Sequence, residues 1–462
     1  PDNALLIDLQ EDSSIVTEKA NYTIVHKDSV KEDEGAYYFQ TEFPEDYILN
    51  TKGRNKDIGI IKGKGSTGSF FTAMFPDYYV SQLDNSIINT YYHLNTGGNG
   101  PSVFANMNVV LQVKTAISDL LNNHRIEAGV RIPFSLNGSD YFIEYQNRKH
   151  RINWDVGFFR LSRRLDGTFI SRQLINQFTG GIKIPFNETV ALKIHAFGRQ
   201  DKNIILGTDS FSLNQPNNQY TWVGNKTELV FDNTKNIDIN LPYGTRFKIF
   251  AEYYQNTEQS NRNVINLGID YRKYTKLHNK IILANRLTLN ASVGSSKVQY
   301  YIGGIENWVG SSYDGTIARG EGSQYIFQMQ ANSLRGFKQN IRNGTNYFLW
   351  NSEIRIPVAA YVTQNPVRSD FLRNFMVVPF FDLGTAWYGS SPFAEQPYNT
   401  SIVDGGNYIV TVTNAVSPIV ASTGLGLRSR IFGYYVRFDM AWGIDNSEFK
   451  DRIYQFGLGY DF

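Results

Sequence analysis

The sequence predicts an all-β protein, a transmembrane β-barrel of roughly sixteen antiparallel strands. From about Tyr78 to the last residue, apolar and polar residues alternate with the period of two that is typical of β-strands. The alternating segments are roughly 9–11 residues long, the length that a tilted strand needs to cross a bilayer. Their apolar faces are rich in aromatic residues, which make up 14% of the chain.

Residues 1–68 precede the alternating segments, and we expect a linker or the tail of an upstream module there. The segment is charged and weakly patterned, and it ends in the Gly-rich run 62–68, which is typical of a linker. Ser66 does not belong to a nucleophile elbow, because that motif requires Gly two residues earlier and the chain has Lys64. The chain begins at Pro1 without a signal segment, so we expect a mature or truncated piece.

The barrel itself is predicted over residues 69–462. Two segments with weaker alternation, 79–91 and 171–185, bring the strand count to an even number, and no helical pattern interrupts the series. The segments with clear alternation are 103–115, 125–133, 141–148, 152–162, 190–198, 221–231, 246–254, 264–274, 281–292, 347–357, 376–384, 421–428, 434–442 and 453–462.

The two faces of each strand indicate a membrane environment. In the last segment Tyr454 and Phe456 share one face, while Gln455 and Gly457 share the other. A soluble sandwich, the alternative, would bury its apolar face in a dry core. A membrane barrel instead presents an apolar belt to lipid and a polar face to its lumen, and closure satisfies every backbone group. The aromatic-rich apolar faces favour the barrel.

The connections alternate between short turns and long loops, as expected for an outer-membrane barrel. Residues 118–123 form a short turn, whereas 303–345 and 388–417 are long. Loops as long as 303–345 are usually functional or disordered. This one contains the sequence Leu334-Arg335-Gly336-Phe337, which we call the loop tip.

Each residue type in the loop tip has a physical use. Arg335 offers a rigid fork of donors that carboxylates can bind in two places at once. Gly336 allows a backbone turn that other residues resist, and Phe337 supplies an apolar plug. The alternative is an ordinary surface Arg in a hairpin.

The end of the chain has the pattern of a closing strand. Gln455, Gly457, Tyr460 and the final Phe462 follow the spacing of the last strand in bacterial outer-membrane barrels. Gly457 and Gly459 weaken such a strand, since Gly packs no side chain and costs backbone entropy. The strand could therefore form a weak seam, or the glycines could serve ordinary close approach between strands.

Composition excludes several other functions. The chain has no Cys, so it has no disulfide framework and no thiolate metal site. Its six His residues lack metal-binding spacing, and we predict no catalytic residue, metal or cofactor, and no enzyme. A net charge of +2 gives no argument for binding nucleic acid. No run approaches the roughly 18 apolar residues of a spanning helix.

Several motifs in the C-terminal half occur in an order that resembles one family. The chain is similar to the BamA superfamily, which includes the assembly insertase BamA, TamA and the two-partner secretion transporters. The matching segments are 301–304, the loop tip, 351–357, 380–384, 424–428, 437–441 and Phe462. In addition, residues 77–85 resemble chains in which a TolB-like β-propeller precedes the barrel. Residues 1–65 supply neither the periplasmic repeats nor the phospholipase domain that family members usually carry.

The resemblance implies where the loop tip goes. In the family the long sixth loop folds back into the lumen, and its Arg-Gly-aromatic tip docks on the inner wall. The matching partners would be Glu353 and Asp382. Asp382 lies in the Phe-x-Asp-x-Gly motif of Phe380 and Gly384.

The resemblance also implies a function. It predicts an outer-membrane protein assembly or translocation factor that acts through a lateral seam between segments 79–91 and 453–462. The alternatives are a dedicated secretion pore for one or few partners and a membrane anchor for a periplasmic domain. The expected location is the bacterial outer membrane, with residues 1–68 periplasmic. Expected partners are membrane lipids, client β-barrel or secreted proteins, and periplasmic or lipoprotein accessory subunits, but no nucleic acid.

Overall fold

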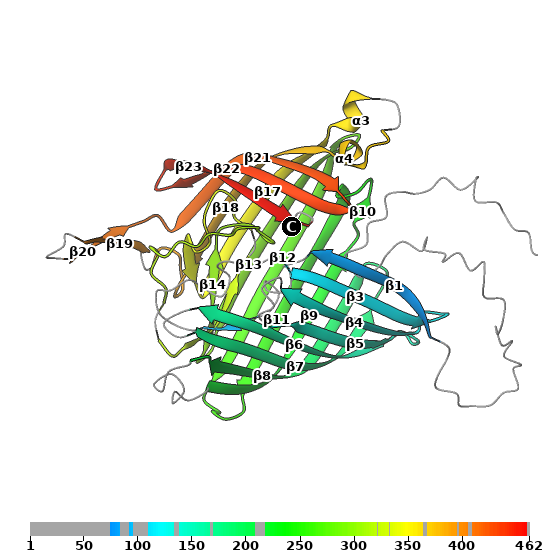
Figure 1. The fold of residues 1–462 in the computed structure, drawn as a ribbon, viewed down its shortest axis with the longest axis horizontal. Coiled ribbons are helices and arrows are strands. Elements are labelled where there is room, and N and C mark those ends of the chain that lie inside the picture. The colour runs from blue at the N-terminus through cyan, green and yellow to red at the C-terminus, as the bar shows by residue number, and fades with distance from the viewer. Residues whose placement is uncertain are drawn as a thin grey trace, which may run out of the picture.

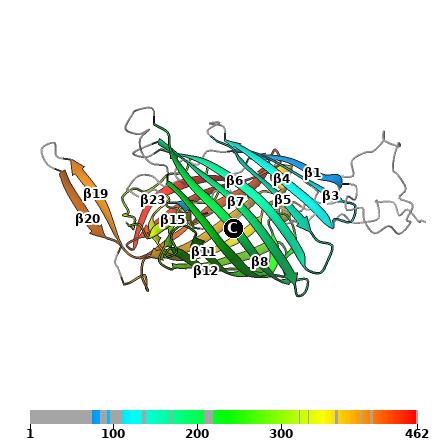
Figure 2. The same ribbon diagram turned by 90° about the horizontal axis from the view of Figure 1, so that it is seen from below.

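One large antiparallel sheet curls into a barrel in the computed structural model (Figures 1 and 2). The structure describes residues 74–83, 92–95, 110–133, 138–166, 170–207, 218–320, 322–331, 333–363, 367–394, 397–404 and 409–459. The expected linker at 1–68 therefore lies outside the described residues, as do Tyr460 and Phe462.

Among the described residues, sixteen long strands form the barrel wall, and each pairs with the next one along the chain. They are β1 (Met74–Leu83), β3 (Val110–Asp119), β4 (His124–Pro133), β5 (Asp140–Asn147), β6 (Asn153–Asp166), β7 (Ile170–Pro185), β8 (Val190–Ile205), β9 (Asn218–Asp232), β11 (Pro242–Asn256), β12 (Asn263–His278), β13 (Ile281–Val293), β17 (Asn346–Pro357), β18 (Met376–Trp387), β21 (Ile419–Ile431), β22 (Tyr434–Asp445) and β23 (Glu448–Leu458). The two-residue β10 (Lys235–Asn236) pairs with β11. The predicted barrel of roughly sixteen strands is confirmed.

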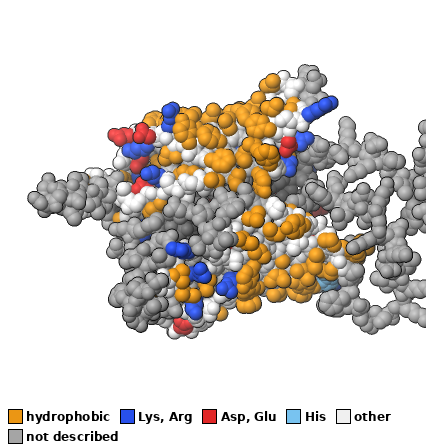
Figure 3. Space-filling model, viewed as in Figure 1, with side chains coloured by type: hydrophobic (Ala, Val, Ile, Leu, Met, Phe, Trp, Pro, Cys, Tyr) orange, Lys and Arg blue, Asp and Glu red, His pale blue; other side chains and the backbone are white. Residues whose placement is uncertain are grey.

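The side chains of the wall alternate in the predicted sense. In β22 and β23 the polar Asp439 and Gln455 are buried inside, while Phe438 and Phe456 are exposed. Hydrophobic side chains cover much of the outer face in Figure 3, and charged ones gather toward its two ends. An apolar belt outside and a polar lumen inside are the arrangement of a membrane barrel.

The two ends of the barrel differ, as the sequence predicted. Short turns join β3 to β4, β7 to β8, β12 to β13 and β21 to β22 at one end. The longest connections, β13–β17 and β18–β21, lie at the other end, where the hairpin of β19 (Tyr398–Asp404) and β20 (Ile409–Ala415) extends from the barrel in Figure 1. The sixth connection at this end, residues 294–345 between β13 and β17, is the sixth loop.

The sixth loop contains secondary structure that the sequence did not predict. Its β14 (Lys297–Ile302), β15 (Tyr325–Gln330) and β16 (Arg342–Gly344) form a small sheet with β2 (His93–Leu94) from the first long connection. This sheet packs through Tyr92 and Phe327 against Trp222 and Tyr254 of the wall. The loop is therefore inserted into the lumen, as expected, but it is a sheet rather than an irregular segment.

Two one-turn helices correct the prediction that no helix interrupts the strands. α3 (Ala359–Val362) and α4 (Asp370–Arg373) lie in the β17–β18 connection at the short-turn end (Figure 1). Ser369 caps α4 by accepting a hydrogen bond from the Leu372 amide at 3.4 Å. Four-residue helices leave no detectable period in the sequence. Among the described residues, no helix has the length and apolar character to cross a membrane.

Candidate functional site: the loop tip on the inner wall

A tight backbone turn presents the loop tip. The Leu334 amide donates to the Gly304 carbonyl at 3.0 Å, and the Gly304 amide donates to the Phe337 carbonyl at 3.1 Å. Gly336 has φ +77°, a left-handed conformation that disfavours a side chain. A Cβ at this position would also lie 3.0 Å from the Gly443 nitrogen on β22. The tip thus depends on Gly336 for both its turn and its close approach to the wall.

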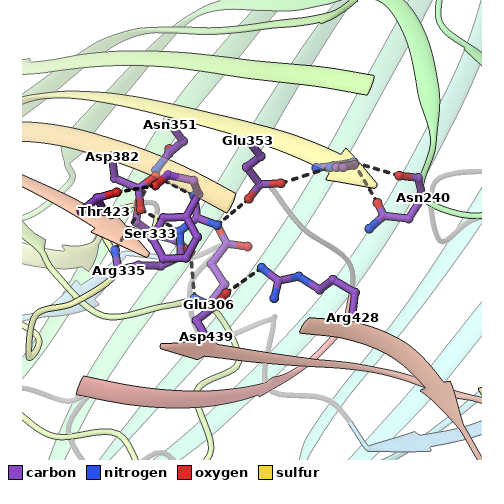
Figure 4. A network of polar contacts seen from close by, with 12 residues as sticks. Asn240, Glu306, Ser333, Arg335, Asn351, Glu353, Asp382, Thr423, Arg428 and Asp439 are labelled. Carbon is purple, nitrogen blue, oxygen red and sulfur yellow. Dashed lines mark hydrogen bonds and ion pairs between the residues drawn. The ribbon is translucent and has the colours of Figure 1, made fainter. Parts of the chain in front are cut away.

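The guanidinium of Arg335 lies between two carboxylates of the wall (Figure 4). Its Nε and Nη2 donate to the two oxygens of Asp382 at 2.7 and 2.6 Å, and its Nη1 donates to Glu353 at 2.5 Å. The backbone amide of Arg335 adds a 3.2 Å bond to Asp382. Its guanidinium carbon lies 3.7 Å from the ring centroid of Phe380, a cation–π contact.

The register of the wall places these acceptors side by side. Asn351 of β17 is opposite Asp382 of β18, and Glu353 is opposite Phe380. The residues on each strand are two positions apart, so all four side chains lie on the same face of the sheet. That face is the one toward the lumen. The Asn351 amide group donates to the Ser333 carbonyl at 2.9 Å, next to the tip. Two adjacent strands therefore bind the tip from one side.

Burial and charge act in opposite directions on Arg335. Burial alone would lower the pKa of its guanidinium, but the nearby carboxylates of Asp382 and Glu353 outweigh burial and raise this pKa above its ordinary range. Arg335 is only 3% exposed. A buried ion pair of this kind is costly to disrupt, since loss of Arg335 would leave Asp382 buried without the cation that binds it.

The last two strands bind the tip from the other side. Gln455 of β23 accepts a hydrogen bond from the Gly336 amide at 3.0 Å and donates to the Phe337 carbonyl at 3.2 Å. The Phe337 ring lies against Gly443, where a Cβ would come within 2.5 Å of it. A Cβ added at Gly384 would lie 3.4 Å from the Leu334 side chain. The tip therefore contacts β17, β18, β22 and β23.

The ion-pair network extends beyond the residues that the sequence indicated. Glu353 also binds Arg355 at 3.1 Å, and Arg355 donates to the backbone and side-chain oxygens of Asn240 at 3.1 and 3.0 Å. Asn240 lies in the β9–β11 turn and has φ +57°. Nothing in the local sequence around Asn240 signals that this turn enters the barrel.

A second arginine fixes the base of the sixth loop. Arg342 is fully buried, pairs with Asp445 of β22 at 2.6 Å and donates to the Ser417 carbonyl at 2.8 and 2.6 Å. No sequence pattern pointed to Arg342, because its partners are distant in sequence and it lies in no recognised motif.

Of the candidate residues, the structure brings together Arg335, Gly336, Phe337, Glu353, Phe380, Asp382, Gly384 and Gln455. Gln455 was expected only as part of the closing-strand pattern, and its bonds to the loop tip were not predicted. Gly457 lies on the last strand, β23, whereas Gly459 follows the end of that strand at Leu458 and has φ +114°. The part of the chain that the structure describes contains no cluster of three His, Asp or Glu residues that could hold a metal ion. The role of these residues in activity stays a prediction.

Comparison with protein families decides the relationship. The model of the Omp85 superfamily domain matches residues 50–462. The chain belongs to the Omp85 superfamily. Members of this superfamily are assembly factors and transporters of the bacterial outer membrane, so the match supports a general role in protein assembly or translocation there. A comparison with curated proteins finds no match.

Three solved structures were compared with this Omp85-superfamily barrel, and the likeness exceeds a TM-score of 0.5 for the first of them. BamA from Haemophilus ducreyi lacking POTRA domains 1–3 is 12% identical with a TM-score of 0.51, over 84% of this chain and 70% of that one. CdiB from Acinetobacter baumannii is 12% identical with a TM-score of 0.44, over 83% and 59% of the two chains. CdiB from Escherichia coli is 11% identical with a TM-score of 0.44, over 85% and 63%. The chain thus spans less than two thirds of either CdiB, and at this identity the BamA likeness concerns the fold alone.

Proposed function

We propose that this chain assembles or translocates proteins at the outer membrane through a lateral seam between β1 and β23, with Arg335 docked to brace the wall. The observation that carries the proposal is the position of the loop tip. One buried turn binds β17 and β18 through Arg335 and binds β23 through Gln455. Such a brace would hold the last strands in place while the seam between β1 and β23 opens.

The ends of the ladder support a seam at this position. The described registers pair β1 with β3 and β23 with β22, and none of them joins β1 to β23. A strand edge that is not joined to a neighbouring wall strand can pair with another strand, which is the chemistry of edge augmentation. The expected closure between segments 79–91 and 453–462 stays a prediction, since 84–91 and 460–462 lie outside the described residues.

Partners and location follow from the same proposal. Lipids of the outer membrane would contact the exposed apolar belt, which includes Leu267, Leu289 and Phe456. Clients would be β-barrel or secreted proteins, helped by periplasmic or lipoprotein subunits. β1 begins at the short-turn end, and short turns lie on the periplasmic side of such barrels. We therefore propose that residues 1–68 are periplasmic and that the barrel domain is 69–462.

A dedicated transporter is the alternative, and the inserted sheet is the observation that favours it. The sheet of β14, β15, β16 and β2 occupies the lumen, so passage of a partner would require that this sheet moves. Depletion of the protein followed by a quantitative outer-membrane proteome tests both functions. A broad loss of barrel proteins supports the assembly factor, whereas loss of one or a few exported proteins supports the transporter. An unchanged proteome would contradict both and would indicate a membrane anchor.

A further inference from the structure

The last strand, β23, has one edge that faces away from β22. The Gly459 amide donates to the Tyr435 carbonyl of β22 at 2.8 Å. The backbone N–H and C=O groups of successive residues point alternately to the two sides of a strand. The N–H and C=O of Gly457 therefore also point toward β22, and those of Phe456 point away from it. The carbonyl of Phe456 is therefore an acceptor on the seam side of the barrel.

A segment of the sixth loop occupies this acceptor. The Val309 amide donates to the Phe456 carbonyl at 2.9 Å. Its neighbour Trp308 forms an antiparallel bridge opposite Gly457. Residues 306–309, which we call the edge segment, thus act as a short additional strand on β23.

Contacts from the lumen hold the edge segment in place. Arg437 of β22 donates to the Glu306 carbonyl, and the Glu306 amide donates to the Ser333 hydroxyl at 3.0 Å. Ser333 lies two residues before Arg335, so the edge segment and the loop tip belong to one hydrogen-bonded unit. The position of the edge segment is therefore coupled to the docking of the tip.

The bridge places a large residue opposite a glycine. Trp308 is only 4% exposed. Opposite it, Gly457 has no side chain, and a Cβ there would lie 3.1 Å from Ile305 and 2.8 Å from Arg437. The lumenal side of β23 thus takes a large aromatic group opposite a glycine.

We propose that the edge segment is a built-in competitor for the seam, which must leave β23 before another strand can pair there. The proposal rests on the proposed function and adds its regulation and its specificity. A displacing strand must run antiparallel to β23, donate its amide to the Phe456 carbonyl and place a large inward-facing apolar side chain opposite Gly457. Release of the loop tip from Asp382 and Glu353 favours the exchange, because the tip and the edge segment are bonded to each other.

A disulfide tests the proposal cleanly, because the chain has no Cys. Trp308 and Gly457 are a non-hydrogen-bonded antiparallel pair, whose Cα atoms are about 4.5 Å apart in typical sheets. That distance lies in the range that disulfides span. The variant is Trp308→Cys/Gly457→Cys. The matched control is Met440→Cys/Tyr454→Cys, a pair that joins β22 to β23 on the outer face and leaves the seam-side edge open.

The first readout is the crosslink itself in isolated outer membranes, scored on non-reducing gels. We expect nearly complete oxidation of the 308–457 pair, comparable with the control pair. Absence of this crosslink, while the control pair oxidises, would overturn the proposal whatever the protein does.

The second readout is rescue of cells depleted of the wild-type protein, measured by the outer-membrane proteome. The oxidised 308–457 variant should lose rescue at least tenfold, and a reductant should restore it, whereas the control should rescue in both states. Full rescue by the oxidised variant would overturn the proposal. If depletion itself leaves the proteome unchanged, the proposed function is wrong, and the crosslink alone still decides whether the edge is covered.

Discussion

The loop tip provides the sharpest prediction, the substitution Arg335→Ala. This change removes three side-chain bonds, leaves Asp382 buried without the guanidinium that binds it, and leaves Glu353 with Arg355 alone. Removing one partner of a buried ion pair costs about 3–5 kcal/mol. At about 1.4 kcal/mol per tenfold change, the ratio of docked to released tip should fall by roughly 10²–10⁴. The wall strands do not depend on this side chain for their ladders, so the barrel should remain folded.

Limited proteolysis with trypsin measures this release at Lys338. The Lys338 side chain is exposed, but Phe337 and Gln339 beside it are buried, so cleavage requires that the tip leaves the wall. Arg335→Ala should be cleaved at Lys338 in the folded barrel, with folding checked by the gel mobility of unheated protein. Arg335→Lys, which keeps the charge but loses the fork, should be intermediate.

Arg373→Ala is the matched control, since Arg373 is half exposed on α4 at the opposite end of the barrel. Its cleavage at Lys338 should equal that of the wild type. Equal protection of Lys338 in Arg335→Ala and the wild type would refute the reasoning.

Three further predictions can be tested in the same proteolysis assay. Gly336→Ala should destabilise the docked tip by about 1–2 kcal/mol, because Ala disfavours the left-handed backbone at this position, and should therefore increase cleavage. Gly315→Ala in the same loop should not increase cleavage, because a Cβ there would lie in open space. Asp382→Asn should increase cleavage more than Glu353→Gln, because Asp382 receives three of the four bonds from Arg335; equal effects would contradict this ranking. Burial raises the pKa of Tyr388, which accepts a bond from the Gly320 amide at 2.8 Å. The Tyr388 hydroxyl then ionises near pH 10 only in the unfolded or released state. The loop therefore has its full stability below about pH 10 and loses stability as the pH rises above that value. Tyr388→Phe should remove this part of the loss of loop stability at alkaline pH. An unchanged dependence of cleavage on pH in this variant would contradict the prediction.

Much of the barrel could be predicted because a strand leaves a local period of two in the sequence. That period, with aromatic residues on the apolar face, located every wall strand and indicated which face is exposed. The ends of strands were less predictable. β8 continues to Ile205, beyond the expected end at residue 198, because polar residues such as Asp201 interrupt the apolar alternation there.

The inside of the barrel was predictable only where a motif pointed to it. Arg335 was proposed from its place and neighbours in a long loop, and its carboxylate partners were proposed from a resemblance. By contrast, Asn240, Arg342 and Trp308 reach their partners across distances of more than one hundred residues. Contacts between such distant segments leave no local pattern. The same holds for β2, two residues long, whose place in the lumenal sheet depends on β15 more than two hundred residues away.

The most direct test of the central claim is complementation in cells depleted of the wild-type protein. The outer-membrane proteome would be compared after expression of the wild type, Arg335→Ala and the Arg373→Ala control. If the docked tip braces a protein-assembling barrel, the wild type and the control should restore the lost proteins, and Arg335→Ala should not, although it reaches the membrane folded. Full restoration by folded Arg335→Ala, or a proteome that depletion never changed, would contradict the account.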